Sequence, residues 1–228
     1  MKKIWLIAAL IFIFGCTRAT PNAHDLYVGK VIGDYSTVIN HPVSINLIML
    51  EDKANESLEE ALKEVSIHNE AIDTVDFTIH KGTSVQGYRL INLELEINSD
   101  SPGIYSFSEI TLTLQDESQI QKKIGTIDVI VLEEETAALD PPEYTSAYPT
   151  LEFKTDLKNN TNQPIRIVSI EGYNKGLKFG DLKVTKNGET IDFIQPNETF
   201  HMEATVTKQK EAPFYVSSPR ITFEAENE

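Results

Sequence analysis

The sequence predicts a mainly β protein with two β-sandwich domains in tandem, both generically immunoglobulin-like, and one short helix in the first. Three observations lead to this prediction. Hydrophobic and polar residues alternate over most of the chain, turn residues recur about every eight to twelve positions, and a proline-containing segment interrupts the pattern past the middle. The composition agrees, because 40% hydrophobic and 24% charged residues are typical of a globular protein.

The clearest alternation in the first half covers residues 88–98, where aliphatic residues at 91, 93, 95 and 97 alternate with polar ones. A period of two is the signature of a half-buried strand. Similar runs occupy residues 43–50, 75–79, 110–114 and 127–131. Pro102-Gly103 predicts a turn between strands, and Gly125 predicts a β-bulge.

One segment of the first half has helical rather than strand periodicity. Ser57 followed three residues later by Glu60 has the spacing of a capping box, in which the two side chains satisfy backbone N–H groups at a helix start. Leu58, Ala61, Leu62 and Val65 then recur at helical spacing. We therefore predict a short helix over residues 57–66, packed across the mouth of the first sandwich.

The alternation stops between residues 133 and 149. An acidic run at 133–135 is followed by Pro141-Pro142 and by Pro149, and consecutive prolines cannot donate hydrogen bonds to a sheet. We predict a linker at 136–146 between an N-terminal domain at 24–135 and a C-terminal domain at 147–228. The acidic residues of this segment allow two interpretations. A solvated run of charges is favoured, and the alternative is a calcium site at the linker formed by Glu133, Glu134, Glu135 and Asp140.

The second half resumes the strand pattern at residues 151–157, 165–170 and 200–206. Asn187-Gly188 is the strongest hairpin signal in the chain, because a type I′ turn needs a positive φ at both central positions. Residues 214–216 and 220–225 are expected to complete the C-terminal sheet.

The N-terminus has the pattern of an export signal. Lys2 and Lys3 precede an apolar run at 4–14, which is followed by Gly15-Cys16. This run is shorter than the roughly 20 residues that a transmembrane helix needs. Residues 13–16, Ile-Phe-Gly-Cys, resemble a lipobox, the motif at which bacterial lipoproteins are acylated on cysteine and cleaved before it.

The lipobox resemblance implies a signal peptide at 1–15, cleavage between Gly15 and Cys16, lipidation of Cys16 and a tether at 16–23. The mature chain would lie on the extracytoplasmic face of the cell membrane, held there by the lipid. The two-domain layout also resembles that of uncharacterised surface lipoproteins of Gram-positive bacteria. That resemblance rests on layout, so it transfers no functional residues.

Charge and cysteine content exclude several classes of function. The net charge of −15 becomes −17 when Lys2 and Lys3 are removed, so a nucleic-acid partner is not expected. Cys16 is the single cysteine, which leaves no disulfide framework and no cysteine-based metal site. An acidic body is also repelled by anionic lipid, so attachment would depend on the acyl chains.

No motif for catalysis or cofactor binding is found. Ser84, in Gly82-Thr83-Ser84-Val85-Gln86-Gly87, is the nearest candidate for a nucleophile, but it lacks the expected Gly-x-Ser-x-Gly sequence. The five histidines are not spaced like metal ligands, and we interpret them as surface residues: His24, His41, His68, His80 and His201. We therefore predict a protein that is not an enzyme and has no cofactor or metal.

The expected function is a non-catalytic binding or scaffold module for a protein or cell-envelope partner. Sandwich domains bind through end loops or by offering an edge strand, and the loops at 100–104 and 172–180 are the candidates here. No individual binding residue is predicted. The alternative is a ligand- or metal-ion-binding receptor serving a transporter or sensor, with its pocket between the domains or under the helix.

Overall fold

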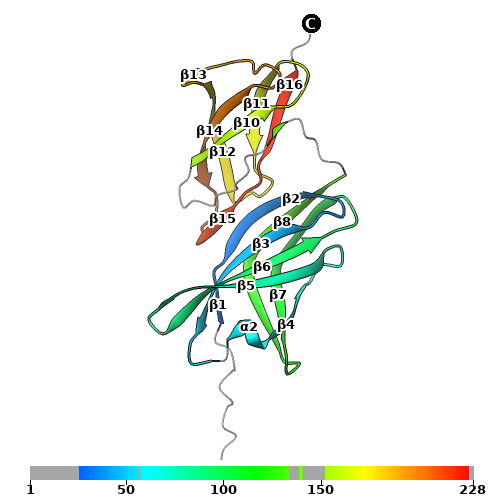
Figure 1. Cartoon of the computed structure of the whole chain (residues 1–228), viewed down its shortest axis with the longest axis vertical. Helices are drawn as coiled ribbons and strands as arrows, with labels where there is room; N and C mark the ends of the chain where they lie inside the picture. The colour runs from blue at the N-terminus through cyan, green and yellow to red at the C-terminus, as the bar shows by residue number, and fades with distance from the viewer. Residues whose placement is uncertain (1–25, 56, 134–138, 141–151, 226–228) are drawn as a thin grey trace, which may run out of the picture.

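The computed structural model describes residues 26–55, 57–133, 139–140 and 152–225. These residues form sixteen strands and one four-residue helix, which are arranged in several sheets (Figure 1). The predicted mainly β, sandwich-like fold is confirmed. The predicted signal peptide and tether lie outside the described residues, as does most of the predicted linker.

Two sheets face each other in the N-terminal part. The first is antiparallel and has the order β1-β3-β6-β5, and the second has the order β15-β2-β8-β7-β4. The strands of the first sheet are β1 (Leu26–Val28), β3 (Val43–Asp52), β5 (Asp73–Val85) and β6 (Tyr88–Asn98). Those of the second are β2 (Val31–Val38), β4 (Leu62–Ile67), β7 (Gly103–Leu114), β8 (Gln119–Leu132) and β15 (Phe214–Val216).

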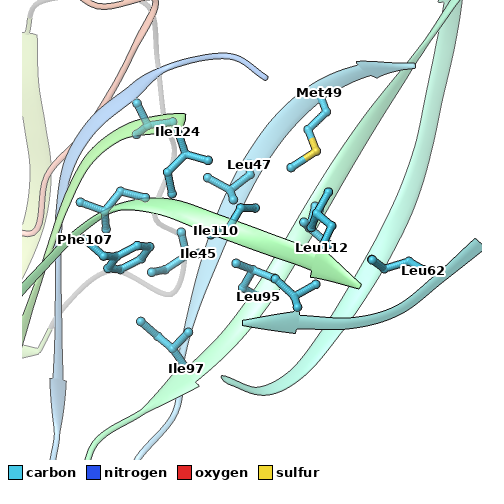
Figure 2. Close-up of a cluster of buried hydrophobic side chains, with 14 of the residues drawn as sticks. Ile45, Leu47, Met49, Leu62, Leu95, Ile97, Phe107, Ile110, Leu112 and Ile124 are labelled. Carbon is cyan, nitrogen blue, oxygen red and sulfur yellow. The ribbon is translucent and has the colours of Figure 1, made fainter. Parts of the chain in front are cut away.

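The core between these sheets is made by the alternating residues of the sequence pattern. Ile45 and Leu47 of β3 and Leu95 of β6 lie opposite Ile110 and Leu112 of β7, and none of the five is exposed (Figure 2). Burying an aliphatic side chain of this size contributes roughly 1.5–3 kcal/mol. Alternation in the sequence therefore translates directly into one buried face on each sheet.

The C-terminal part has a second, separate core. Its five-stranded sheet has the order β13-β12-β14-β10-β9, and β11 pairs with β16 in a two-stranded sheet. The strands are β9 (Leu139–Asp140), β10 (Glu152–Asn159), β11 (Ile165–Glu171), β12 (Leu177–Lys186), β13 (Glu189–Thr190), β14 (Thr199–Lys208) and β16 (Arg220–Ala225). Leu157, Ile165, Ile194, Phe200 and Met202 are among its buried residues.

Two local predictions about glycine are confirmed. The β7–β8 register shifts after Phe107, opposite Gly125, which has φ +107°. Asn187 and Gly188 have φ of +51° and +86° and join β12 to β13, as the predicted type I′ turn requires. The bulge and the hairpin therefore both follow from residues that tolerate a positive φ.

The predicted helix over 57–66 is wrong in length. Helix α2 covers only Leu58–Ala61, and Leu62–Ile67 form β4, which pairs with β7. The Ser57 side chain makes no capping bond: the Glu60 N–H donates to the Ser57 carbonyl at 3.0 Å, and Glu51 of β3 accepts the Leu58 N–H at 2.8 Å. Leu62 and Val65 are buried in the observed strand, and the predicted helix would have buried them as well, so their apolar spacing alone did not distinguish helix from strand.

The expectation that residues 214–216 complete the C-terminal sheet is also wrong. Strand β15 pairs in parallel with Val31–Gly33 of β2, at the edge of an N-terminal sheet. The chain thus leaves the C-terminal part after β14, adds one short strand to the N-terminal part and returns as β16 (Figure 1). The predicted bounds of the two domains remain predictions.

Candidate functional site

Several residues singled out from the sequence lie outside the described part of the chain. These are Gly15, Cys16, His24 and the acidic residues Glu134 and Glu135. Glu133 is exposed, and Asp140 belongs to β9, although its side chain is not described. The lipidation site and the calcium alternative therefore remain predictions.

His41 is exposed, and the side chains of the other three described histidines have polar partners on three different strands. His68 Nε2 lies 2.8 Å from Thr111 Oγ1, and His80 Nε2 lies 2.8 Å from Glu94 Oε2. His201 Nδ1 lies 2.7 Å from Asp156 Oδ1. Within residues 26–225, where described, no three histidine or acidic side chains are grouped as metal ligands would be. Ser84 lies in β5 opposite Arg89, and the turn after it leads to another strand.

The first surface suited to partner binding is the free edge of β5. This strand has 13 residues and pairs with β6 on one side, with no strand on its other side in the described structure. Its pairing is regular from Asp76 to Lys81, between two bulges. Phe77 and Ile79 pack against the core but stay half-buried at this edge, whereas Thr78 and His80 are exposed on the outer face.

The second surface is an apolar patch at the end of the same hairpin. Cross-strand pairs place Tyr27, Leu50, Val85, Tyr88 and Leu90 together on the outer face of the β1-β3-β6-β5 sheet, and we call them the hairpin patch. The rings of Tyr27 and Tyr88 meet edge to face, with centroids 5.7 Å apart. Tyr27, Leu50 and Val85 are 56%, 40% and 62% exposed, which marks a contiguous patch and not isolated residues.

A partly buried ion pair lies next to the turn of this hairpin, at the same end as the patch. Glu51 is buried, and its two carboxylate oxygens have different partners: Oε1 accepts from Arg89 Nη1 at 2.6 Å, and Oε2 accepts from the Leu58 N–H. Gln86 and Gly87, with φ of +49° and +89°, form the turn, and the Gly87 carbonyl accepts the Lys53 N–H at 3.0 Å. The patch therefore sits on a fixed support, because β3, β6 and α2 are tied together beneath it.

A polar junction connects the N-terminal sheet to the C-terminal part. Asp34 of β2 is 1% exposed, and its side chain accepts hydrogen bonds from Ser217 Oγ and from the Ser218 N–H at 3.0 Å. Asn174 Nδ2 donates to Asp128 Oδ2 at 2.9 Å, and Asn174 Oδ1 accepts the Gly176 N–H. The predicted binding loop at 172–180 is thus used in part for this junction, whereas Ile104 in the other predicted loop is 62% exposed.

Burial raises the pKa of Asp34 above 3.8, the hydrogen bonds from Ser217 and Ser218 oppose that rise, and the nearby Asp128 adds to it. The folded state therefore binds this proton more tightly than the unfolded state. Protonation of Asp34 therefore stabilises the folded state. The free energy of unfolding rises as the pH falls from the raised pKa toward 3.8, and this gain is lost as the pH rises again.

We expect Asp34→Asn to remove this pH dependence. An asparagine oxygen still accepts the Ser218 N–H, and its amide donates to Ser217 Oγ, so the variant should stay within about 1 kcal/mol of the wild type at pH 7. Urea unfolding of both proteins between pH 4 and 7 measures the effect. The wild type should gain stability relative to the variant as pH falls, and a relative loss would contradict the assignment.

A receptor pocket was expected between the two parts or under the helix. Between the parts, Asn174 Nδ2 donates to the Gly33 carbonyl at 3.3 Å, and under the helix the Leu58 and Ala61 side chains are buried. A hollow of about 530 Å³ lies elsewhere, on the C-terminal sheet, and is open and lined by Asp156, Lys186, His201 and other mostly polar residues.

In comparisons with known proteins, no family model and no curated protein matches the chain. Matches to solved structures include a protein of unknown function from Porphyromonas gingivalis W83, at 13% identity and TM-score 0.27, covering 80% of this chain and 83% of that one. The secreted serine protease VesC from Vibrio cholerae matches at 8% identity and TM-score 0.23, covering 84% and 49%. The C-terminal domain of the AgI/II polypeptide BspA from Streptococcus agalactiae matches at 10% identity and TM-score 0.21, covering 88% and 96%.

These TM-scores carry no information on function, so the site rests on this chain alone. Among the described residues, no helix has the length and apolar character to span a bilayer. Sequence reasoning missed the hairpin patch, since its members come from four strands and only their cross-strand register brings them together. Tyr88 and Leu90, two residues apart at the start of the clearest alternating run, were the available signal.

Proposed function

We propose that this protein is a lipid-anchored, extracytoplasmic binding or scaffold module without catalytic activity, which holds a protein partner at the cell membrane. The proposed anchor is a lipid on Cys16, following the lipobox at 13–16. The observation that carries the binding role is the free edge of β5. Its regular pairing with β6 and the half-buried side chains along it determine which kind of partner it can bind.

The partner that suits this edge is an extended peptide segment that adds as an antiparallel or parallel strand. Edge strands present unpaired N–H and C=O groups, and natural proteins usually cover or blunt them. Between its two bulges β5 keeps the regular stretch Asp76–Lys81, in which Asp76 Oδ1 accepts the Phe77 N–H at 2.8 Å and the half-buried Phe77 and Ile79 side chains lie along the edge. An added strand with apolar residues toward the core would cover both side chains, while its backbone pairs with β5.

The test uses a photo-crosslinking amino acid in place of Thr78, on the exposed face of the edge strand. The matched control replaces Thr207, which is exposed on β14, a strand with neighbours on both sides. In cells, position 78 should form a crosslink to a discrete protein that position 207 does not form.

We further expect Ile79→Lys to reduce the position-78 crosslink at least about tenfold, because an inward-pointing charge blunts an edge strand. Val168→Lys, at a site 46% exposed on β11, is the control and should leave the crosslink unchanged. A crosslink that survives Ile79→Lys would contradict strand addition at this edge. Equal labelling from positions 78 and 207 would contradict a specific partner there.

A further inference from the structure

From the geometry of the hairpin patch we infer that it is a second membrane contact, resting on the headgroup region of the bilayer beside the lipid anchor. This inference rests on the proposed function, because it requires the lipid on Cys16. It adds an orientation to that proposal: one end of the N-terminal sheet faces the membrane, and the edge of β5 leads away from it.

The chemistry of the patch suits the bilayer interface. Its tyrosines combine an apolar ring with a polar hydroxyl, a combination that favours the headgroup level, and Leu50 and Val85 add aliphatic surface. The β5–β6 hairpin that carries Val85 projects beyond the sandwich beside β1 (Figure 1). A projecting apolar tip can reach the acyl boundary while the rest of the sheet remains in water.

The position of the patch in the chain argues for the bilayer as its occupant. Tyr27 is the second described residue, and Cys16 precedes Leu26 by ten positions. Ten residues span at most about 35 Å, so a lipid on Cys16 keeps the patch within that distance of the membrane surface. Tethering of this length raises the effective concentration to the millimolar range, so a weak contact is enough.

The charges near this contact are mixed in sign, although the mature chain is acidic. Arg89 pairs with Glu51 and Lys81 pairs with Glu59, while Asp52, opposite Tyr88, and the exposed Lys53 add one charge of each sign. The contact is therefore apolar and needs no anionic lipid. Vesicles of zwitterionic phosphatidylcholine are the appropriate probe, because the net charge of −17 after loss of Lys2 and Lys3 from −15 disfavours an anionic surface.

Tryptophan fluorescence in the full, processed protein tests the inference. Trp5 is the only tryptophan, and it lies in the segment that signal cleavage removes. Val85→Trp places a reporter in the patch. Ile104→Trp is the matched control, because Ile104 has the same 62% exposure but follows the far end of the 11-residue strand β6. Both variants are bound to phosphatidylcholine vesicles with and without brominated acyl chains.

Brominated lipid should quench the emission of the Val85→Trp variant by roughly half and leave the Ile104→Trp variant nearly unchanged, as expected for a tip inserted about 5–10 Å. Adding Tyr27→Ser and Leu50→Ser to the Val85→Trp variant should remove most of that quenching while the protein still sediments with vesicles. An unquenched Val85→Trp variant that sediments would overturn the inference and leave the patch as a surface for a protein partner. Equal quenching of both reporters would overturn it as well.

Failure of the anchor has a different signature. The wild type without an added reporter should show no tryptophan emission, and emission from Trp5 would show that the signal segment is retained. Protein that does not sediment with vesicles would contradict the anchor and, with it, the membrane contact. Sedimentation thus reports on Cys16, and quenching reports on the patch.

Discussion

Replacing Gly125 by alanine is expected to lower the free energy of unfolding by more than about 3 kcal/mol, one of the two largest effects of a single substitution in this protein. Gly125 has φ +107°, and it lies opposite Val31 where β8 pairs in parallel with β2. An added Cβ would lie 1.9 Å from the Val31 carbonyl oxygen and 2.7 Å from its nitrogen. Backbone atoms cannot move aside as a side chain can, so the β2–β8 pairing has to separate locally.

Gly188→Ala is the matched control for this prediction. Gly188 has a positive φ of +86°, but an added Cβ in this hairpin turn would have nothing within 4 Å. Gly188→Ala should lower the free energy of unfolding by about 1–2 kcal/mol, which is the penalty of placing alanine in a left-handed backbone conformation. Urea unfolding of both variants separates the steric contribution from the conformational one. Equal destabilisation of the two would show that the contact with Val31 contributes little.

Glu51→Gln is expected to lower the free energy of unfolding by about 2–4 kcal/mol. The Glu51 side chain is 5% exposed, and it serves Arg89 and the Leu58 N–H at once. A glutamine has one oxygen for these two donors, so either the arginine or the helix N–H loses its partner. The cost is below that of a fully buried pair, because the Arg89 side chain is 24% exposed and keeps some water.

Glu224→Gln provides the control, because the Arg166–Glu224 pair has side chains 54% and 60% exposed. Exposed pairs contribute about 0–1 kcal/mol, so this variant should unfold close to the wild type. Thermal or urea unfolding measures both changes. Hydrogen exchange should also quicken at residues 58–61 in Glu51→Gln alone, and unchanged exchange there would contradict the capping role of Glu51.

The strands could be predicted from the sequence because their information is local. Ile91, Leu93 and Leu95 alternate with polar residues, and a sheet with one buried face requires that pattern. The Asn187-Gly188 turn was predictable for the same reason. The β5–β6 turn was not, since Gln86 at a φ of +49° is not a residue that signals such a turn.

The remaining features depend on contacts between residues far apart in the sequence. Ser57 and Glu60 match a capping box, but Glu51 of the neighbouring strand caps the helix instead. The place of β15 is set by pairing with β2 and by bonds from Ser217 and Ser218 to Asp34, more than 180 residues earlier. Local periodicity predicts that a strand forms, but it does not predict which sheet the strand joins.

The central claim is that a lipid on Cys16 holds the β5 edge where its partner is found. The most direct measurement is the crosslink from position 78, made in cells and compared between the otherwise wild-type chain and Cys16→Ala, with membrane and soluble fractions separated. We predict that Cys16→Ala moves the protein out of the membrane fraction and that the discrete crosslinked partner is lost or strongly reduced. Membrane association and crosslinking that are both unchanged in Cys16→Ala would contradict this account.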